Sequence, residues 1–128
     1  MSAYLLDTHV LIWALSAPER LSERCRKTLT DSNEVYVSAA SLWEMSIKAG
    51  LGKLTLPTDF SDSHIQQRGY RLLDVTAAHA LAVRHLPTYH KDPFDRLLVV
   101  QAQLEQLTLV TIDKSLDAYD VSRLSACE

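Results

Sequence analysis

Short apolar segments of strand length alternate with longer segments of helical pattern along this chain, and this alternation restricts the fold more than any other feature. The strand-like segments lie at residues 4–6, 35–37, 72–75 and 107–112, with an edge strand expected at 121–124. Strands separated by helices pair in parallel, because each crossover returns the chain to the same edge of the sheet. The pattern therefore predicts an α/β fold, a three-layer α/β/α sandwich around a mostly parallel sheet of four to five strands.

Capping residues and proline mark where the helices begin. Helices are expected at 10–15, 22–30, 39–49, 58–69, 77–85 and 93–107. Asp7 or Thr8 can cap the first of them, and Ser38 is a suitable N-cap for the third. Asp92-Pro93 combines an acidic N-cap with proline at the first helical position. Several helices thus begin within a few residues of an expected strand end.

Length and composition indicate one ordinary globular unit. The chain has 128 residues, 47% of them hydrophobic, and residues 1–128 are expected to form a single domain. Neither a membrane span nor a secretion signal is visible, so a cytoplasmic location without membrane contact is expected. The net charge of −3 argues against nucleic-acid binding through a broad basic surface, so any contact with phosphate must be local.

Four acids occur just beyond an expected strand end or on the helix that follows one. They are Asp7, Glu44, Asp95 and Asp113. The carboxyl ends of parallel strands meet at one edge of a sheet, so these side chains can converge. Convergent carboxylates repel one another unless a cation lies between them. Because oxygen ligands and bound water suit a hard divalent ion, the pattern predicts a Mg²⁺ or Mn²⁺ site rather than a zinc site.

Each acid taken alone also has a structural explanation. Asp7 and Asp95 are placed to stabilise helix N-termini, and Asp113 can cap a turn. Glu44 lies inside a largely apolar helical segment, where its structural partner is Lys48, four residues further on. Four independent structural roles are a less economical explanation than one cation site. The prediction therefore depends on the four acids together.

The sequence lacks the motifs of several other site classes. The two cysteines form no CxxC pair and the histidines no HExxH pattern, which argues against zinc. The three glycines form neither a GxxxxGK[ST] nor a GxGxxG loop, and GxSxG is absent. P-loop nucleotidases, dinucleotide enzymes and enzymes with a serine nucleophile elbow are therefore disfavoured.

The acids lie in four ordered segments that resemble the motifs of one protein family. The segments are YLLDTH (4–9), SLWEMSIK (41–48), DPFDRLL (92–98) and LVTID (109–113). Together they resemble the PIN-domain ribonucleases, specifically the VapC-type toxins of bacterial toxin–antitoxin pairs. The stretch 50–57 is similar to the connector in one branch of that family. The resemblance extends over almost the whole chain.

The resemblance implies a PIN-like fold and a metal-dependent endoribonuclease whose catalytic acids are Asp7, Glu44, Asp95 and Asp113. We hypothesise that Asp7 and Asp95 hold one Mg²⁺ or Mn²⁺ directly, while Glu44 and Asp113 complete the site, orient water or recruit a second ion. The resemblance further implies cleavage that leaves a 5′-phosphate and a 3′-hydroxyl. It also implies a homodimer, a small cognate antitoxin protein as partner, and RNA, single-stranded or looped, as substrate.

Further residues are candidates for supporting roles in such a site. The candidates for orienting carboxylates or water are Thr8, Asp92, Thr111 and Ser115, and the candidates for contacting phosphate are Lys48, Lys91 and Arg96. Each has a structural alternative, which is a cap or turn for the first group and solvation or pairing with an acid for the second.

Two other function classes match part of the pattern. An aspartyl-phosphate phosphatase or receiver domain also carries acids at strand ends. A phosphatase is expected to have a second acid two residues after its nucleophile, whereas His9 occupies that position after Asp7. A non-catalytic module that binds a cation or a basic peptide is the other alternative, and an activity assay separates it from the enzyme.

Overall fold

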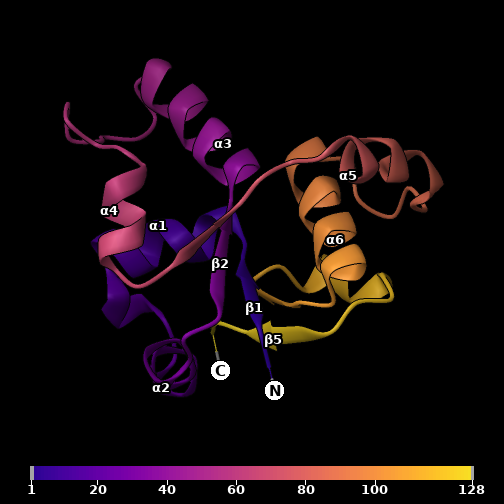
Figure 1. The fold of residues 1–128 in the computed structure, drawn as a ribbon, viewed down its shortest axis with the longest axis horizontal. Helices are drawn as coiled ribbons and strands as arrows, with labels where there is room; N and C mark the ends of the chain where they lie inside the picture. The colour runs from indigo at the N-terminus through magenta and orange to yellow at the C-terminus, as the bar shows by residue number, and fades with distance from the viewer. Residues whose placement is uncertain (1, 128) are drawn as a thin grey trace.

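The computed structural model describes residues 2–127, which form one five-stranded sheet with its covering helices (Figure 1). The strands are β1 (Tyr4–Leu6), β2 (Val35–Ser38), β3 (Arg71–Leu73), β4 (Thr108–Thr111) and β5 (Arg123–Ser125). Their order is β3-β2-β1-β4-β5, and every neighbouring pair is parallel. The predicted α/β fold is confirmed, with a sheet that is parallel throughout instead of mostly parallel.

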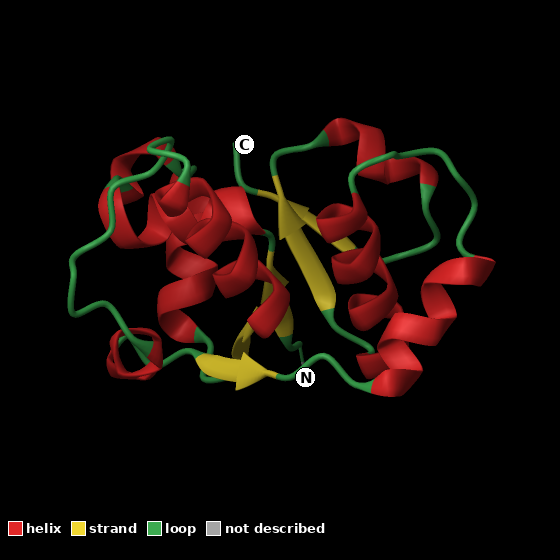
Figure 2. Ribbon diagram, turned by 90° about the horizontal axis from the view of Figure 1, so that it is seen from above, coloured by secondary structure: helices red, strands yellow, loops and turns green. Residues whose placement is uncertain are grey.

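Helices cover both faces of this sheet, which is the middle of three layers (Figure 2). The α-helices are α1 (Thr8–Ser16), α2 (Glu23–Asp31), α3 (Ala39–Gly50), α4 (Asp62–Gln67), α5 (Ala77–Ala82) and α6 (Pro93–Glu105). The 3₁₀ turns are η1 (Pro18–Arg20), η2 (Val83–His85) and η3 (Lys114–Ala118). Within residues 2–127, the helices are too short or too polar to cross a lipid bilayer.

Strands β1 and β4, which are neighbours in the middle of the sheet, are buried on both faces. Consecutive residues of a strand point to opposite faces of the sheet. Leu5 and Leu109 pack in one core together with Leu98 of α6. Leu6 and Val110 pack in the core on the opposite face, which α1 and α2 cover. The near-continuous apolar sequence of these strands follows from this double burial, because an alternating pattern arises only where one face meets water.

Leu109 of β4 lies in the core beneath α6. Leu109 is fully buried, so Leu109→Ala removes packed methyl groups and leaves a cavity. We expect the free energy of unfolding to fall by about 3 kcal/mol, measured by urea denaturation followed by circular dichroism. Leu104→Ala on α6 is the matched control, because Leu104 is 51% exposed and its loss should cost less than about 0.5 kcal/mol. Equal losses in the two variants would contradict this description of the core.

The order of the strands reverses between β1 and β4. The chain runs from β1 through β2 to β3 on one side, and β4 and β5 lie on the other. In an open parallel sheet, ligands bind in the crevice outside the carboxyl ends at such a reversal. Asp7 directly follows β1, and Asp113 lies just beyond β4. The topology therefore brings two of the predicted acids to the same crevice.

One predicted helix boundary differs clearly from the structure. The helix expected over 58–69 is α4, which begins only at Asp62. The backbone N–H of Ser61 donates to Nδ1 of His64, 3.1 Å away, and this contact closes the first turn there. His64 occupies the third helical position, where a usual capping box has Glu or Gln. The sequence pattern therefore did not reveal that the helix begins here.

Two strands are displaced along the chain from their predicted positions. The strand expected at 72–75 is β3, which ends at Leu73 because its partner β2 ends opposite it at Ser38. The edge strand expected at 121–124 is β5, whose pairing with β4 begins at Arg123. The helix expected at 77–85 ends as α5 at Ala82 and continues as the 3₁₀ turn η2 to His85, and the remaining predicted elements agree within about two residues at each end. Strand ends are decided by the neighbouring strand, which a single segment does not contain.

Candidate metal-binding active site

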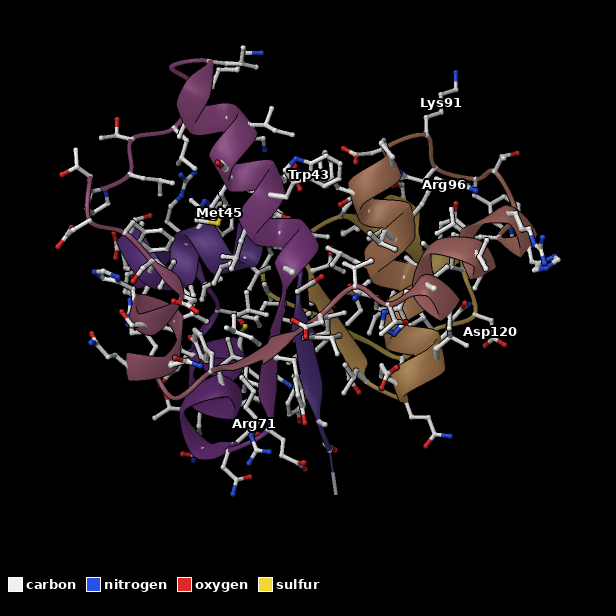
Figure 3. The ribbon with its side chains drawn as sticks, turned by 45° about the horizontal axis from the view of Figure 1, so that its top comes forward. Trp43, Met45, Arg71, Lys91, Arg96 and Asp120 are labelled. Atoms are coloured by element: carbon white, nitrogen blue, oxygen red, sulfur yellow. The ribbon has the colours of Figure 1, made fainter. Side chains whose placement is uncertain are left out.

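The four predicted acids line one pocket of about 340 Å³ at the carboxyl edge of the sheet. Its lining residues are Asp7, Thr8, His9, Glu44, Lys48, Asp92, Asp95, Ile112 and Asp113. Helices α3 and α6 stand on either side of this edge, with Trp43 of α3 directed toward α6 (Figure 3). The Trp43 ring meets Phe94 of α6 edge to face, with 5.1 Å between ring centroids. Segments far apart in sequence thus deliver their acids to one place.

Asp7 combines a structural role with a place in the pocket. Its Oδ1 accepts a hydrogen bond from the Val10 backbone N–H at 2.8 Å, so Asp7 is the N-cap of α1. The side chain is almost completely buried. Burial raises the pKa of the Asp7 carboxyl, although hydrogen bonds from Thr111 and the Val10 backbone partly offset this. Asp7 therefore caps α1 and also lines the pocket.

Asp95 lies in the first turn of α6, and its environment disfavours its charged form. Burial, together with the negative charges of Asp92, Asp7 and Glu44, raises the pKa of this carboxyl to about 7, although the nearby His90 partly offsets the rise. Asp92 is the N-cap of α6, since its Oδ1 accepts from the backbone N–H of Phe94 at 2.8 Å and of Asp95 at 3.3 Å. Asp92 thus has the capping role that its Asp-Pro sequence indicated, within the same pocket.

Glu44 has one oxygen paired and the other buried without a partner. Its Oε2 lies 3.2 Å from Nζ of Lys48, which is the expected pair four residues apart on α3. Its Oε1 is buried and accepts no hydrogen bond. A buried acceptor without a donor costs free energy, and a cation in the pocket would compensate that cost. This orphaned oxygen is an observation that favours a metal over a purely structural cluster.

Asp113 is held on both of its carboxylate oxygens. Oδ1 accepts from the backbone N–H of Ser115 at 2.9 Å and from its hydroxyl at 2.6 Å. Oδ2 lies 3.0 Å from Nε2 of His90. Burial alone would raise the pKa of Asp113, but the hydrogen bonds from Ser115 and His90 outweigh burial and bring the pKa below its ordinary value. Asp113 is therefore charged under conditions in which Asp95 is partly protonated.

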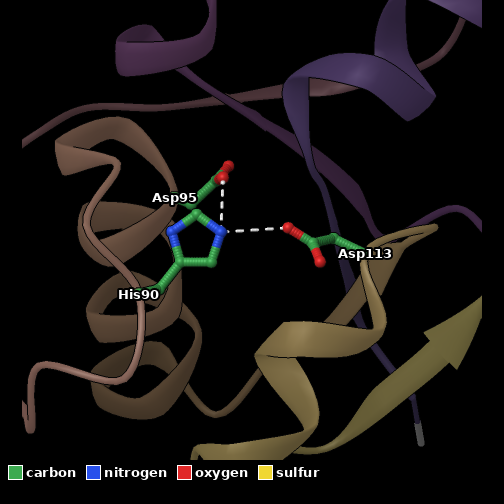
Figure 4. Close-up of side chains that lie close together, drawn as sticks. All are labelled: His90, Asp95 and Asp113. Atoms are coloured by element: carbon green, nitrogen blue, oxygen red, sulfur yellow. Dashed lines mark hydrogen bonds and ion pairs between the residues drawn. The ribbon is translucent and has the colours of Figure 1, made fainter.

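His90 belongs to this cluster but was not among the residues selected from the sequence. Its Nε2 lies 3.0 Å from Asp113 and 3.5 Å from Asp95 (Figure 4). Ligand-type atoms of these three side chains all lie within 4.8 Å of one another. The sequence contained one signal, which is that His90 stands two residues before the N-cap Asp92, where a side chain can turn back onto the helix start.

The supporting residues divide into those that touch an acid and those that do not. Ser115 contacts Asp113, and the Thr111 hydroxyl accepts from the Asp113 backbone N–H at 3.0 Å and bonds to Asp7. The Thr8 hydroxyl instead donates to Ser41 at 3.0 Å and ties α1 to α3. Thr111 and Ser115 are therefore the better supported of the predicted orienting residues.

The three basic candidates also differ in position. Lys48 lines the pocket but is paired with Glu44. Lys91 is exposed in the loop just before α6, and its ammonium extends into solvent (Figure 3). Arg96 does not line the pocket, and its guanidinium donates to backbone carbonyls of the segment before α6. Arg96 was a candidate for contacting phosphate beside a structural alternative, and these hydrogen bonds favour a structural role.

Comparison with known proteins agrees with this arrangement. The pattern of the PIN domain family matches residues 4–122. The chain belongs to the PIN domain family. Ribonuclease VapC22 of Mycobacterium tuberculosis is 30% identical to this PIN domain over 122 residues, which cover 93% of each chain.

Solved structures share the fold of this PIN domain. A DNA-bound VapBC from Salmonella typhimurium superposes with a TM-score of 0.74 at 16% identity, over 99% of this chain and 100% of that one. A toxin–antitoxin complex from Klebsiella pneumoniae gives a TM-score of 0.67 at 17% identity, over 98% and 99% of the two chains. At such low identity the likeness establishes the fold, and the resemblance seen in the sequence motifs is confirmed by the family match.

The raised pKa of Asp95 makes the stability of the metal-free PIN domain depend on pH. The folded-state pKa is about 7, above the unfolded value, so the folded state binds more protons and its stability falls as pH rises from about 4 to 7. Asp95→Asn should therefore stabilise the metal-free protein at pH 7.5 by about 1 to 2 kcal/mol, an advantage that disappears near pH 4. Thermal unfolding in EDTA at both pH values measures this. If Asp95→Asn differed from the wild type in stability by the same amount at both pH values, the raised pKa of Asp95 would be refuted.

Proposed function

We propose that this PIN domain is a Mg²⁺- or Mn²⁺-dependent endoribonuclease that acts as the toxin of a toxin–antitoxin pair. The observation that carries the proposal is the convergence of Asp7, Glu44, Asp95 and Asp113 in one pocket, with the buried Glu44 Oε1 lacking a donor. The name of the relative VapC22, a ribonuclease similar over 93% of its length, supports RNA as the substrate class. The proposed site of action is the cytoplasm, where RNA is available.

The donor set of the pocket suits a hard divalent ion. Asp7 and Asp95 would hold it, and the ion when bound lowers the pKa of a coordinated water and offsets negative charge on the phosphoryl oxygens. Glu44 and Asp113 complete the site, orient the attacking water or recruit a second ion. Ser115 and His90 keep Asp113 oriented through the hydrogen bonds at its two oxygens. Attack in line with the leaving 3′-oxygen yields a 5′-phosphate and a 3′-hydroxyl.

Basic residues near the acids would contact the RNA backbone. Lys48 lines the pocket, and its ammonium, now paired with Glu44, would be available to a phosphate if Glu44 held a cation. Lys91 is exposed beside the N-terminus of α6 and is suited to a phosphate of the flanking chain. The net charge of −3 makes such local contacts the main electrostatic attraction.

The proposed partners are a small antitoxin and a second copy of this chain. The Klebsiella pneumoniae structure is a toxin–antitoxin complex with the same fold, which supports an antitoxin partner here. The homodimer rests on the family resemblance, and light scattering on the purified protein tests it. A molar mass near twice the 14.4 kDa of the chain is expected, and a value of one chain would contradict it.

A cleavage assay tests the proposed activity. Purified protein is incubated with a single-stranded RNA in Mg²⁺, Mn²⁺ or EDTA, and the product ends are identified by their susceptibility to a 5′-phosphate-dependent exonuclease. Cleavage in either metal and none in EDTA is the expected result. Equal cleavage in EDTA would remove the metal mechanism. Metal binding without cleavage of any RNA tried would favour the non-catalytic module.

A further inference from the structure

His90 contacts two of the acids at once, and the proposed metal chemistry does not by itself explain why. Its Nε2 is 3.0 Å from Oδ2 of Asp113, at the end of β4, and 3.5 Å from Oδ2 of Asp95, on α6 (Figure 4). A single ring atom therefore links acids that two separate elements deliver. This placement fits either a ligand of the ion or a donor to the ligands, and the other ring nitrogen distinguishes between them.

Nδ1 of His90 accepts a hydrogen bond from the backbone N–H of Asp92 at 3.1 Å. An imidazole nitrogen that accepts a hydrogen bond carries no proton, so the proton of the neutral ring is on Nε2. Nε2–H then donates to Oδ2 of Asp113, and the Asp95 carboxylate lies 3.5 Å from the same nitrogen. The backbone at the start of α6 thus determines the tautomer of this side chain.

A donor Nε2 cannot also be a metal ligand. Histidine binds a metal through a nitrogen lone pair, and the nitrogen that carries the proton has none available. Ligation through Nε2 would move the proton to Nδ1 and break the bond from Asp92. The hydrogen bonds therefore assign His90 to the carboxylates of the site, although its distances alone would also suit a ligand.

The backbone of His90 is held on both sides, so the ring is fixed in place. Its N–H donates to the Tyr119 hydroxyl at 2.9 Å, and its carbonyl accepts from Nη1 of Arg96 at 3.3 Å. The Tyr119 hydroxyl in turn donates to the Pro87 carbonyl at 2.8 Å. Only 17% of the His90 side chain is exposed. Fixed donors of this kind orient metal-binding carboxylates before the ion arrives.

We propose that His90 is a positioning residue, which holds Asp95 and Asp113 in the arrangement that binds the ion and does not bind the ion itself. The inference rests on the proposed function, because it concerns the same acids. One Nε2–H reduces the repulsion between two carboxylates that must lie close together. With Ser115 on its other oxygen, Asp113 then has a single orientation toward the pocket.

Two substitutions separate the functions of the two ring nitrogens. The oxygen of His90→Asn can replace Nδ1 as acceptor for the Asp92 N–H, but its side chain ends before the position of Nε2. The amide of His90→Gln can extend to the position of Nε2 and donate there. His85→Asn is the matched control, because His85 is exposed and lies outside the pocket.

The readout is Mn²⁺ affinity by calorimetry without RNA, with thermal unfolding to confirm that each variant is folded. We expect His90→Asn to weaken binding by about 10- to 100-fold, as is usual for residues that orient metal ligands, while His90→Gln recovers most of it and His85→Asn has no effect. Unchanged affinity in His90→Asn, or no recovery in His90→Gln, overturns the proposal. Wild-type protein that binds no Mn²⁺ overturns the metal site as well, so the two failures are distinguishable.

Electron spin echo spectroscopy of the wild-type complex with Mn²⁺ provides the second measurement. Coupling from a directly bonded ¹⁴N is expected to be absent, because all ligands from the chain are carboxylate oxygens. A directly bonded ¹⁴N signal that His90→Asn abolishes would make His90 a ligand and overturn its assignment as a positioning residue.

Discussion

Asp95→Asn is expected to lower the rate of RNA cleavage by about 10²- to 10³-fold at saturating Mg²⁺. The substitution keeps the shape of the side chain but removes one of the charges that would hold the ion. Asp95 is suited to this test because Asp92, and not Asp95, caps α6. The helix should therefore remain intact while the chemistry is lost. Initial rates on a fluorogenic single-stranded RNA measure the effect.

The control for this loss is Asp59→Asn, which removes the same charge at an exposed position outside the pocket. It should cleave RNA at the wild-type rate. Asp95→Asn should at the same time be more stable than the wild type in EDTA, since a repelling charge is gone. Loss of activity together with gain of stability distinguishes a metal ligand from a structural acid. Wild-type cleavage by Asp95→Asn would rule out the proposed mechanism.

Arg96→Ala is expected to lower the free energy of unfolding by about 2 to 4 kcal/mol. Nη1 of Arg96 donates to the carbonyls of Pro87 and His90 at 3.0 and 3.3 Å, and Nη2 to those of Val83 and Leu86 at 3.3 Å each. Removing the guanidinium leaves these carbonyls without their shared donor. The loop that carries His90 should then lose its fixed geometry.

Arg96→Lys tests whether geometry or charge matters at this position. An ammonium keeps the positive charge but lacks the planar fork that serves several acceptors, so lysine should recover little of the lost stability. A phosphate-binding role would give the reverse result, with normal stability, a raised KM for RNA in Arg96→Ala and recovery in Arg96→Lys. Arg84→Ala, at an exposed position, controls for loss of a surface charge. Urea denaturation and steady-state kinetics together separate the two roles.

Local sequence signals were sufficient to predict most elements and the convergence of the four acids in one pocket. Ser38 and Asp92 cap the helices that their sequence positions indicated, and alternation of strands and helices predicted the parallel sheet. These features depend on residues a few positions apart, and a cap or a double-buried strand has the same pattern in any fold. The carboxyl ends of parallel strands then bring Asp7 and Asp113 together without further information.

Features that join distant segments were not predictable in the same way. Nothing near His90 in sequence shows that its ring meets Asp113, which lies 23 residues further along the chain. The sequence made Arg96 a candidate for contacting phosphate. The carbonyl oxygens that accept its hydrogen bonds come close to it only when the loop before α6 has folded back. The ends of β3 and β5 likewise follow from the strands beside them.

The sequence by itself determined the α/β class, most helix starts and which four acids converge in the pocket, because each is encoded by short-range pattern and the geometry of parallel strands. Tertiary structure alone decided the raised pKa of Asp95, the unpaired oxygen of Glu44 and the tautomer of His90. Burial, charge repulsion and hydrogen bonding act between atoms that are close in space, and chain folding alone makes these side chains neighbours.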